Sequence, residues 1–200
     1  MRNNKLFKQK ITKEEINVLP RKSFDGEIVY IDSLDAFHEF FPEINGTKLL
    51  GFDTETKPAF KKGQNNEVAL LQLSTDCKAF LFRLNIIGMP SALTEILSNE
   101  DIIKAGVALR DDIAGLRKLR DFEPAGFIDL QDYVKEFSIE DNGLKKLVAN
   151  ILGFQISKRQ QTSNWEHEIL TEAQIEYAAT DAWVCNLIYQ RLKEIENGRE

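Results

Sequence analysis

Short apolar runs separated by polar turns dominate the first half of the chain. Each run is rich in β-branched or aromatic residues, a composition typical of buried or half-buried strands. This pattern predicts strands at residues 27–31, 48–53, 68–74, 79–82 and 102–107. Amphipathic spacing predicts helices at residues 33–41, 91–97 and 111–119. Strands that alternate with helices favour a sheet covered by helices.

The second half of the chain has helical periodicity. Apolar residues recur at i, i+3, i+4, i+7 and i+8, and Gly153 follows them as a C-cap. These residues are Leu144, Leu147, Val148, Ile151 and Leu152. A longer amphipathic segment at residues 172–194 begins with a capping box formed by Thr171 and Gln174. The order of elements predicts the α/β class, with a mixed central sheet flanked by helices.

Composition changes this picture little. At 200 residues, 42% hydrophobic and 29% charged, the chain suits one domain, which we place at residues 23–196 behind a basic N-terminal extension at residues 1–22. No apolar run is long enough to cross a bilayer, so we expect no membrane partner. The two cysteines, far apart in sequence, are expected to be free thiols in a reducing cytosol, which favours a cytoplasmic location.

Three short acidic segments carry the candidate chemistry. Asp53 and Glu55 follow an apolar strand and, two residues apart, share one face of it. Asp112 lies at a strand-to-helix junction, the rim where open α/β sheets bind ligands. Tyr177 and Asp181 are four residues apart in a helical pattern and also share a face.

Each segment alone has an ordinary interpretation. The first could be a solvated acidic turn, the second a helix N-cap and the third a packing aromatic. Together they offer four carboxylates, which cannot all stay ionised at close range without cations. Two hard divalent metals, Mg²⁺ or Mn²⁺, would resolve this repulsion and clamp a phosphate for in-line attack. The net charge of −6 does not oppose this interpretation, because bound metals supply positive charge where a phosphate must lie.

The three segments together resemble the DEDD superfamily of 3'-5' exonucleases, in its tyrosine-bearing branch, and within it the Werner syndrome exonuclease domain and ribonuclease D. Residues 51–55 match the first motif, residues 106–112 the second, and residues 158–165 with 177–181 the third and its approach. Glu176 stands where the sister branch has a histidine, which indicates the tyrosine type. The resemblance covers roughly residues 19–192 and implies the ribonuclease H-like (DnaQ-like) fold.

The resemblance also implies roles for individual residues. Asp53, Glu55 and Asp181 would hold the metal that activates water, with Asp53 bridging to a second metal that Asp112 helps to place. Tyr177 would orient the attacking water or the scissile phosphate. Its ordinary pKa near ~10 makes it a poor general base.

The expected partner is a nucleic-acid 3' end, single-stranded or recessed, with DNA slightly favoured over RNA. Lys158 lies where the family keeps a lysine near the substrate phosphates, so we expect a phosphate contact; the alternative is a solvated loop lysine. Because the chain ends soon after the third motif, we expect no appended helicase or second nucleic-acid-binding domain. Binding is then expected to be weak and distributive unless a protein partner or the basic N-terminal extension holds the substrate.

Two other functions compete with the exonuclease. One is a catalytically silent nucleic-acid-binding module of the same fold, although the chain lacks none of the five expected site residues. The other is an aspartyl-phosphate phosphohydrolase, suggested by Asp53-Thr54-Glu55-Thr56. That chemistry pairs two aspartates two residues apart, and Glu55 breaks the pattern.

Overall fold

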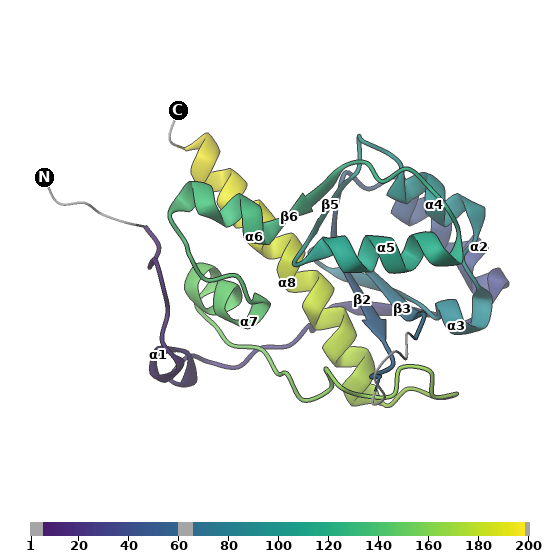
Figure 1. Ribbon diagram of the computed structural model, residues 1–200, viewed down its shortest axis with the longest axis horizontal. Helices are drawn as coiled ribbons and strands as arrows, with labels where there is room; N and C mark the ends of the chain where they lie inside the picture. Colours follow the sequence, from purple (N-terminus) through teal and green to yellow (C-terminus); the bar gives the residue numbers. More distant parts are fainter. Residues whose placement is uncertain (1–5, 60–65, 199–200) are drawn as a thin grey trace, which may run out of the picture.

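A mixed sheet lies at the centre of the computed structural model, which describes residues 6–59 and 66–198 (Figure 1). Its order is β1-β4-β3-β2-β5-β6. The central strand β2 runs antiparallel to β3 and parallel to β5. The strands are β1 Glu27–Ile31, β2 Leu49–Thr56, β3 Val68–Ser74, β4 Lys78–Phe82, β5 Ile103–Gly106 and β6 Phe127–Asp129. The predicted α/β class with a mixed sheet is confirmed.

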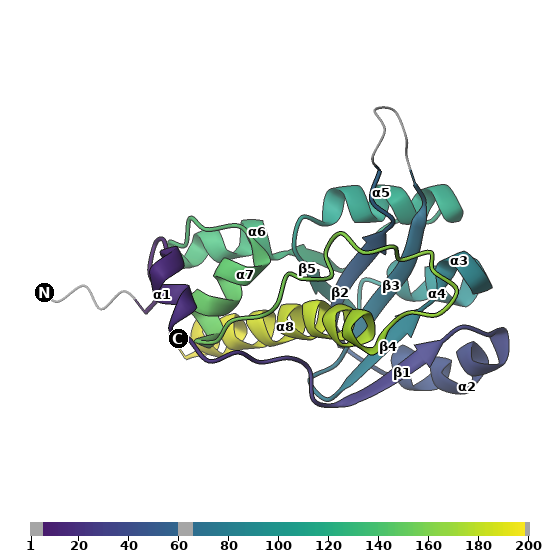
Figure 2. The same ribbon diagram turned by 90° about the horizontal axis from the view of Figure 1, so that it is seen from below.

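Helices cover both faces of the sheet (Figures 1 and 2). The long helix α8 crosses one face, where it packs on the central strands. On the other face, α2, α4 and α5 bury their apolar sides against the largest hydrophobic cluster. The helical elements are α1 Lys13–Asn17, α2 Leu34–Asn45, α3 Leu84–Ile87, α4 Ser91–Leu97, α5 Leu109–Leu119, α6 Leu130–Tyr133, the 3₁₀ turn η1 Val134–Phe137, α7 Leu144–Leu147, the π-helical turn η2 Val148–Leu152 and α8 Glu172–Asn197.

Two elements near the site have ends that differ from the predicted ones. Strand β2 continues through Thr56, past the predicted end at residue 53, because its pairing with β3 persists through Asp53, Thr54 and Glu55. Helix α5 begins at Leu109 rather than at residue 111. The carboxylates of β2 therefore belong to the sheet itself, and Asp112 lies in the first turn of a helix.

Helix ends follow the capping chemistry of the sequence. The Thr171 side chain accepts from the Gln174 amide, and the reciprocal bond from the Thr171 amide to the Gln174 side chain completes the predicted capping box. Gly153, with φ of 74°, ends η2 in the left-handed conformation that favours glycine. Helix α2 passes through Pro42 to Asn45, beyond the predicted end at residue 41, and buries Ile44 completely.

The described part of the N-terminal segment packs along the body of the domain. Phe7, Ile11 and Ile16 are buried. The amide of Ile11 donates to Oδ2 of Asp141 at 2.7 Å. Within residues 6–59 and 66–198, no helix is long and apolar enough to span a bilayer. Both cysteines are free thiols, as predicted.

Candidate active site

Three carboxylates meet between the central strand and the long helix. Asp53 and Glu55 project from β2 toward α8, and Asp181 projects from α8 toward β2. One oxygen from each carboxylate lies within 4.8 Å of the other two. Glu55 and Asp181 are buried, whereas Asp53 is partly exposed. We call these three residues the carboxylate triad.

A glycine and an asparagine set the separation and register of the two elements. A Cβ atom on Gly51 would lie 1.9 Å from the carbonyl oxygen of Ala182, so only glycine allows α8 to approach β2 this closely. One helical turn further along α8, the buried Asn186 side chain donates to the carbonyl oxygens of Leu49 and Ser74 at 3.2 and 3.1 Å. These contacts place Asp181 opposite Asp53.

The triad is electrostatically costly without a cation. Burial, and next the charges of Asp181 and Asp112, raise the pKa of Asp53 well above its ordinary value. Burial, and next the charge of Asp53, raise the pKa of Glu55 to about 10. Burial raises the pKa of Asp181 to about 7, against the opposing effects of a hydrogen bond from Tyr177 and the charge of Lys158. The metal-free triad therefore holds protons that isolated carboxylates would release near neutral pH.

The donor set fits a hard divalent cation. All three groups offer oxygen ligands, which Mg²⁺ and Mn²⁺ prefer. Oδ1 of Asp181 is buried and has no hydrogen-bond partner within the described residues. A buried carboxylate oxygen without a partner is energetically unfavourable, and coordination to a cation would satisfy it.

Tyr177 lies one helical turn before Asp181, and its hydroxyl acts on that carboxylate as a hydrogen-bond donor, which lowers the pKa of Asp181. Its ring packs against the fully buried Trp165, with centroids 6.0 Å apart. Burial, and next the negative charges of Asp181 and Glu55, raise the pKa of Tyr177 far above its ordinary value. The hydroxyl is therefore a hydrogen-bond donor rather than a base, and Trp165 supports it from behind.

Asp112 lies outside the triad, in the first turn of α5, but its charge acts on Asp53 and Glu55. Strand alternation points Thr54 away from Asp53 and Glu55, toward α5. The Thr54 hydroxyl donates to Oδ1 of Asp112. Burial raises the pKa of Asp112 to about 6, although this hydrogen bond opposes the rise. The structure therefore brings three of the four candidate carboxylates together and holds the fourth nearby through Thr54.

Asp129 positions the helix that carries Asp112. At the end of β6, its carboxylate accepts from the amide of Leu109 at 3.0 Å and from the amide of Ala108 at 3.3 Å. Ala108 has φ of 60°, a left-handed conformation that is unfavourable for alanine. The same carboxylate caps α6 through the amide of Gln131. The sequence gives no sign that Asp129 caps two helices.

Arg83 is a second residue that sequence reasoning missed. Its guanidinium is fully buried and donates to the carbonyl oxygens of His167, at 2.6 Å, and Glu168, at 3.3 Å. These bonds tie the end of β4 to the loop that carries Trp165 and leads into α8. Nothing in the local sequence distinguishes this arginine from a surface one.

A cavity of about 300 Å³ opens above the carboxylates. The triad, Tyr177 and Lys158 all line it, together with residues 143–145, 156 and 157. Asp112 is not among the lining residues. The positive charge of Lys158 acts on Asp181, so this lysine lies close enough to affect the triad.

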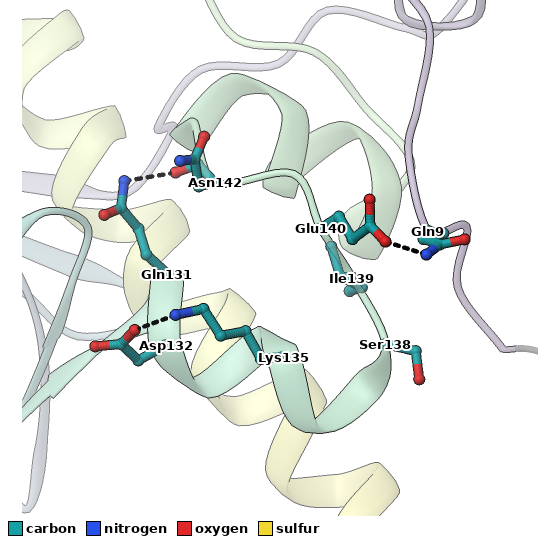
Figure 3. A pocket seen from close by; sticks show the side chains of 8 residues that line it. All are labelled: Gln9, Gln131, Asp132, Lys135, Ser138, Ile139, Glu140 and Asn142. Atoms are coloured by element: carbon teal, nitrogen blue, oxygen red, sulfur yellow. Dashed lines mark hydrogen bonds and ion pairs between the residues drawn. The ribbon is translucent and has the colours of Figure 1, made fainter.

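Figure 3 shows a different cavity, of about 450 Å³, between the N-terminal segment and the region of α6 and η1. Five of its polar side chains are already paired. Gln9 bonds to Glu140, Gln131 donates to the carbonyl oxygen of Asn142, and Lys135 pairs with Asp132. Without a cluster of unsatisfied carboxylates, it is a weaker candidate for metal-assisted chemistry than the cavity above the triad.

Fold and site together define an α/β protein with a carboxylate cluster suited to divalent metals. A family model described as a 3'-5' exonuclease matches residues 28–196, and the chain belongs to this family, within the DEDD superfamily. It is 34% identical over 184 residues to the mouse (Mus musculus) bifunctional 3'-5' exonuclease/ATP-dependent helicase WRN, a match that covers 87% of this chain and 13% of the relative. It is 36% identical over 151 residues to the Drosophila melanogaster exonuclease 3'-5' domain-containing protein 2, covering 72% of this chain and 25% of the relative. The chain thus spans a quarter or less of these two proteins.

Solved structures show the same fold. The Nibbler EXO domain of Aedes aegypti superposes with a TM-score of 0.80 at 24% identity, covering 90% of this chain and 94% of that domain. Escherichia coli RNase D, an exoribonuclease involved in structured RNA processing, superposes with a TM-score of 0.75 at 24% identity, covering 84% of this chain and 45% of RNase D. The expected ribonuclease H-like fold is confirmed.

Proposed function

We propose that this protein is a 3'-5' exonuclease that hydrolyses phosphodiester bonds at nucleic-acid 3' ends with the help of two divalent metal ions. The main supporting observation is the carboxylate triad, with Tyr177 beside it and Lys158 on the cavity wall. Membership of the 3'-5' exonuclease family supports the same reaction.

Within this proposal, Asp53, Glu55 and Asp181 would hold the metals, Asp53 would contribute to both of them, and Asp112 would help to place the second. When bound, Mg²⁺ or Mn²⁺ would lower the pKa of the attacking water and neutralise charge on the phosphate. The protein itself holds the carboxylate side chains in fixed positions. The α8–β2 contact at Gly51 fixes the separation of the carboxylates before any ligand arrives.

Tyr177 and Lys158 act on the substrate. Because the Tyr177 hydroxyl keeps its proton, we propose that it donates a hydrogen bond that orients the attacking water or a phosphate oxygen. Lys158 is exposed at the edge of the same cavity and would contact a phosphate. Neither residue is proposed to remove the proton from water.

We further propose DNA as the slightly favoured substrate over RNA, on the resemblance of residues 144–181 to the Werner type of the family. Choice between the two sugars would depend on contacts to the 2'-hydroxyl. A protein partner that adds substrate affinity and a cytoplasmic location both remain predictions.

A cleavage time course tests the function. The substrates are single-stranded DNA, recessed duplex DNA and RNA of matched sequence, each labelled at the 5' end or at the 3' end. Stepwise shortening from the 3' end in Mg²⁺ or Mn²⁺, abolished by EDTA and by Asp53→Ala, is the expected result. Faster loss of DNA than of RNA would support the substrate preference. Binding without cleavage of any substrate in either metal would instead favour the silent binding module.

A further inference from the structure

A basic groove adjoins the cavity above the triad. Its volume is about 490 Å³, and no carboxylate side chain is among its lining residues. Four lysines line it, and we call this set the lysine groove: Lys13, Lys145, Lys146 and Lys158. In a chain with net charge −6, such a cluster is a local reversal of sign.

The N-terminal segment supplies one wall of the groove. Lys13 opens α1, whose capping box between Thr12 and Glu15 fixes the start of the helix. On its inner side, α1 buries Ile16 in a small apolar cluster with Ile11 and Ala149. Lys13 is therefore carried by an anchored helix beside α7 (Figures 1 and 2).

Helix α7 supplies the facing wall with Lys145 and Lys146. Lys146 pairs with Asp141 at 2.6 Å. Asp141 is 5% exposed and also accepts the amide of Ile11, so one buried carboxylate joins α7 to the N-terminal segment. Within the described residues, Lys13 and Lys145 form no ion pair. Both have donors available for an anionic ligand.

The groove is continuous with the triad cavity. Gly143, Lys145 and Lys158 line both spaces, so a ligand can extend from one into the other. A smaller cavity of about 230 Å³ adjoins Tyr177 on another side, but there Glu176 accompanies the two cations Lys22 and Arg159. The lysine groove has the greater volume and the more uniform charge, and it is the better path for a polyanion.

We infer that the lysine groove binds the sugar–phosphate backbone of the single strand that leads to the 3'-terminal nucleotide, with Lys13 of the N-terminal segment as part of the binding surface. This inference rests on the proposed function, because a 3' end in the triad cavity has chain on its 5' side only. The segment before residue 23 then serves in substrate binding, and the phosphates neutralise lysines that otherwise repel one another.

The test is the salt dependence of binding to a short 5'-labelled single strand, measured by fluorescence anisotropy in EDTA. Lys13→Gln and Lys145→Gln, alone and combined, are compared with Lys118→Gln, an exposed lysine near the far end of α5. Each groove lysine that contacts a phosphate should lower the slope of log affinity against log salt by about 0.7. In the double variant the slope should fall by about twice that amount, whereas Lys118→Gln should keep the wild-type slope.

A wild-type slope in the double variant would overturn the inference. The inference would also be overturned if Lys118→Gln lowered the slope as much as Lys13→Gln, because binding would then depend on the overall charge of the protein. Thermal unfolding of each variant checks that α1 remains docked. Failure of the proposed function looks different: the wild-type protein would bind the strand with the expected slope yet leave it uncut when Mg²⁺ replaces EDTA.

Discussion

The carboxylate triad and the lysine groove are adjacent, and each gathers side chains of one charge sign, negative in the triad and positive in the groove. The two regions differ in how deeply those side chains are buried. The triad joins two buried acids and one partly exposed acid from β2 and α8. Burial raises the pKa of all three, and repulsion by neighbouring carboxylates raises it further for Asp53 and Glu55. The groove joins lysines of α1, α7 and the following loop, and three of the four are exposed. Repulsion between exposed charges is screened by water and salt, whereas repulsion between buried charges is not.

This difference separates two tasks. A buried acidic cluster is unstable alone and is stabilised when a cation binds, so it is suited to hold metals in fixed positions. An exposed basic groove costs the fold little and attracts a flexible polyanion over a distance. Changes in the triad should therefore affect turnover and stability, and changes in the groove should affect binding and its salt dependence.

The largest expected effect is on turnover. Asp181→Asn keeps the size of the side chain but removes the charge, and it should lower the cleavage rate at least about 10²–10³-fold because metal binding fails. The rate is measured under single-turnover conditions in Mg²⁺. Asp132→Asn, at an exposed aspartate of α6, is the matched control. Wild-type turnover in Asp181→Asn would remove this residue from the metal site.

A smaller effect is expected at Tyr177. Tyr177→Phe retains the ring packed on Trp165 and removes the hydrogen bond to Asp181. It should lower kcat about 10–100-fold, the range found for groups that orient the ligands of a catalytic metal, with little change in KM. Steady-state kinetics on one labelled strand separate the two constants. A change confined to KM would contradict an orienting role.

The triad should also make the metal-free protein less stable as pH rises. The folded-state pKa of Asp181, about 7, lies above its unfolded value near ~3.9, so the folded state binds more protons between these limits. In EDTA, the free energy of unfolding should fall from about pH 4 through about pH 7, less steeply in Asp181→Asn. Mg²⁺ should restore stability at the higher pH. Urea unfolding at several pH values measures this, and equal slopes for the two proteins would refute it.

The smallest effect should come from the link that holds α5. Asp129→Ala removes the carboxylate that accepts from the amides of Ala108 and Leu109, and it should lower the free energy of unfolding by about 1–2 kcal/mol. Asp132→Ala, in the exposed first turn of α6, should lower the free energy of unfolding by no more than about 0.5 kcal/mol. Urea unfolding compares the two variants. Equal losses would mean that Asp129 has no special part in holding α5.

Much of the fold could be predicted because local chemistry decides it. The strands rich in β-branched residues, the Thr171 capping box and the Gly153 cap all form as expected. The short elements β6 and α3 are too brief to show a period, and the chain around them has no distinctive composition. Their existence depends on packing against distant elements, which a local pattern does not contain.

The candidate site could be predicted in part for the same reason. Strand alternation correctly places Asp53 and Glu55 on one face, and helical spacing places Tyr177 beside Asp181. Sequence spacing does not show that Asp112 is held by the Thr54 hydroxyl rather than within the triad, because that depends on where α5 packs. Nor does it show that Lys13 and Lys145 line one groove, which depends on the docking of α1.

We propose above that β2 and α8 together form a site for two divalent metals. Calorimetric titration of Mn²⁺ into the metal-free protein and into Asp53→Asn tests it most directly, since Asp53 is the ligand proposed to be shared. We expect two bound ions per wild-type chain and the loss of at least one of them in the variant, with proton release on binding to the wild-type protein near pH 7. Equal stoichiometry and affinity in the two proteins would contradict it.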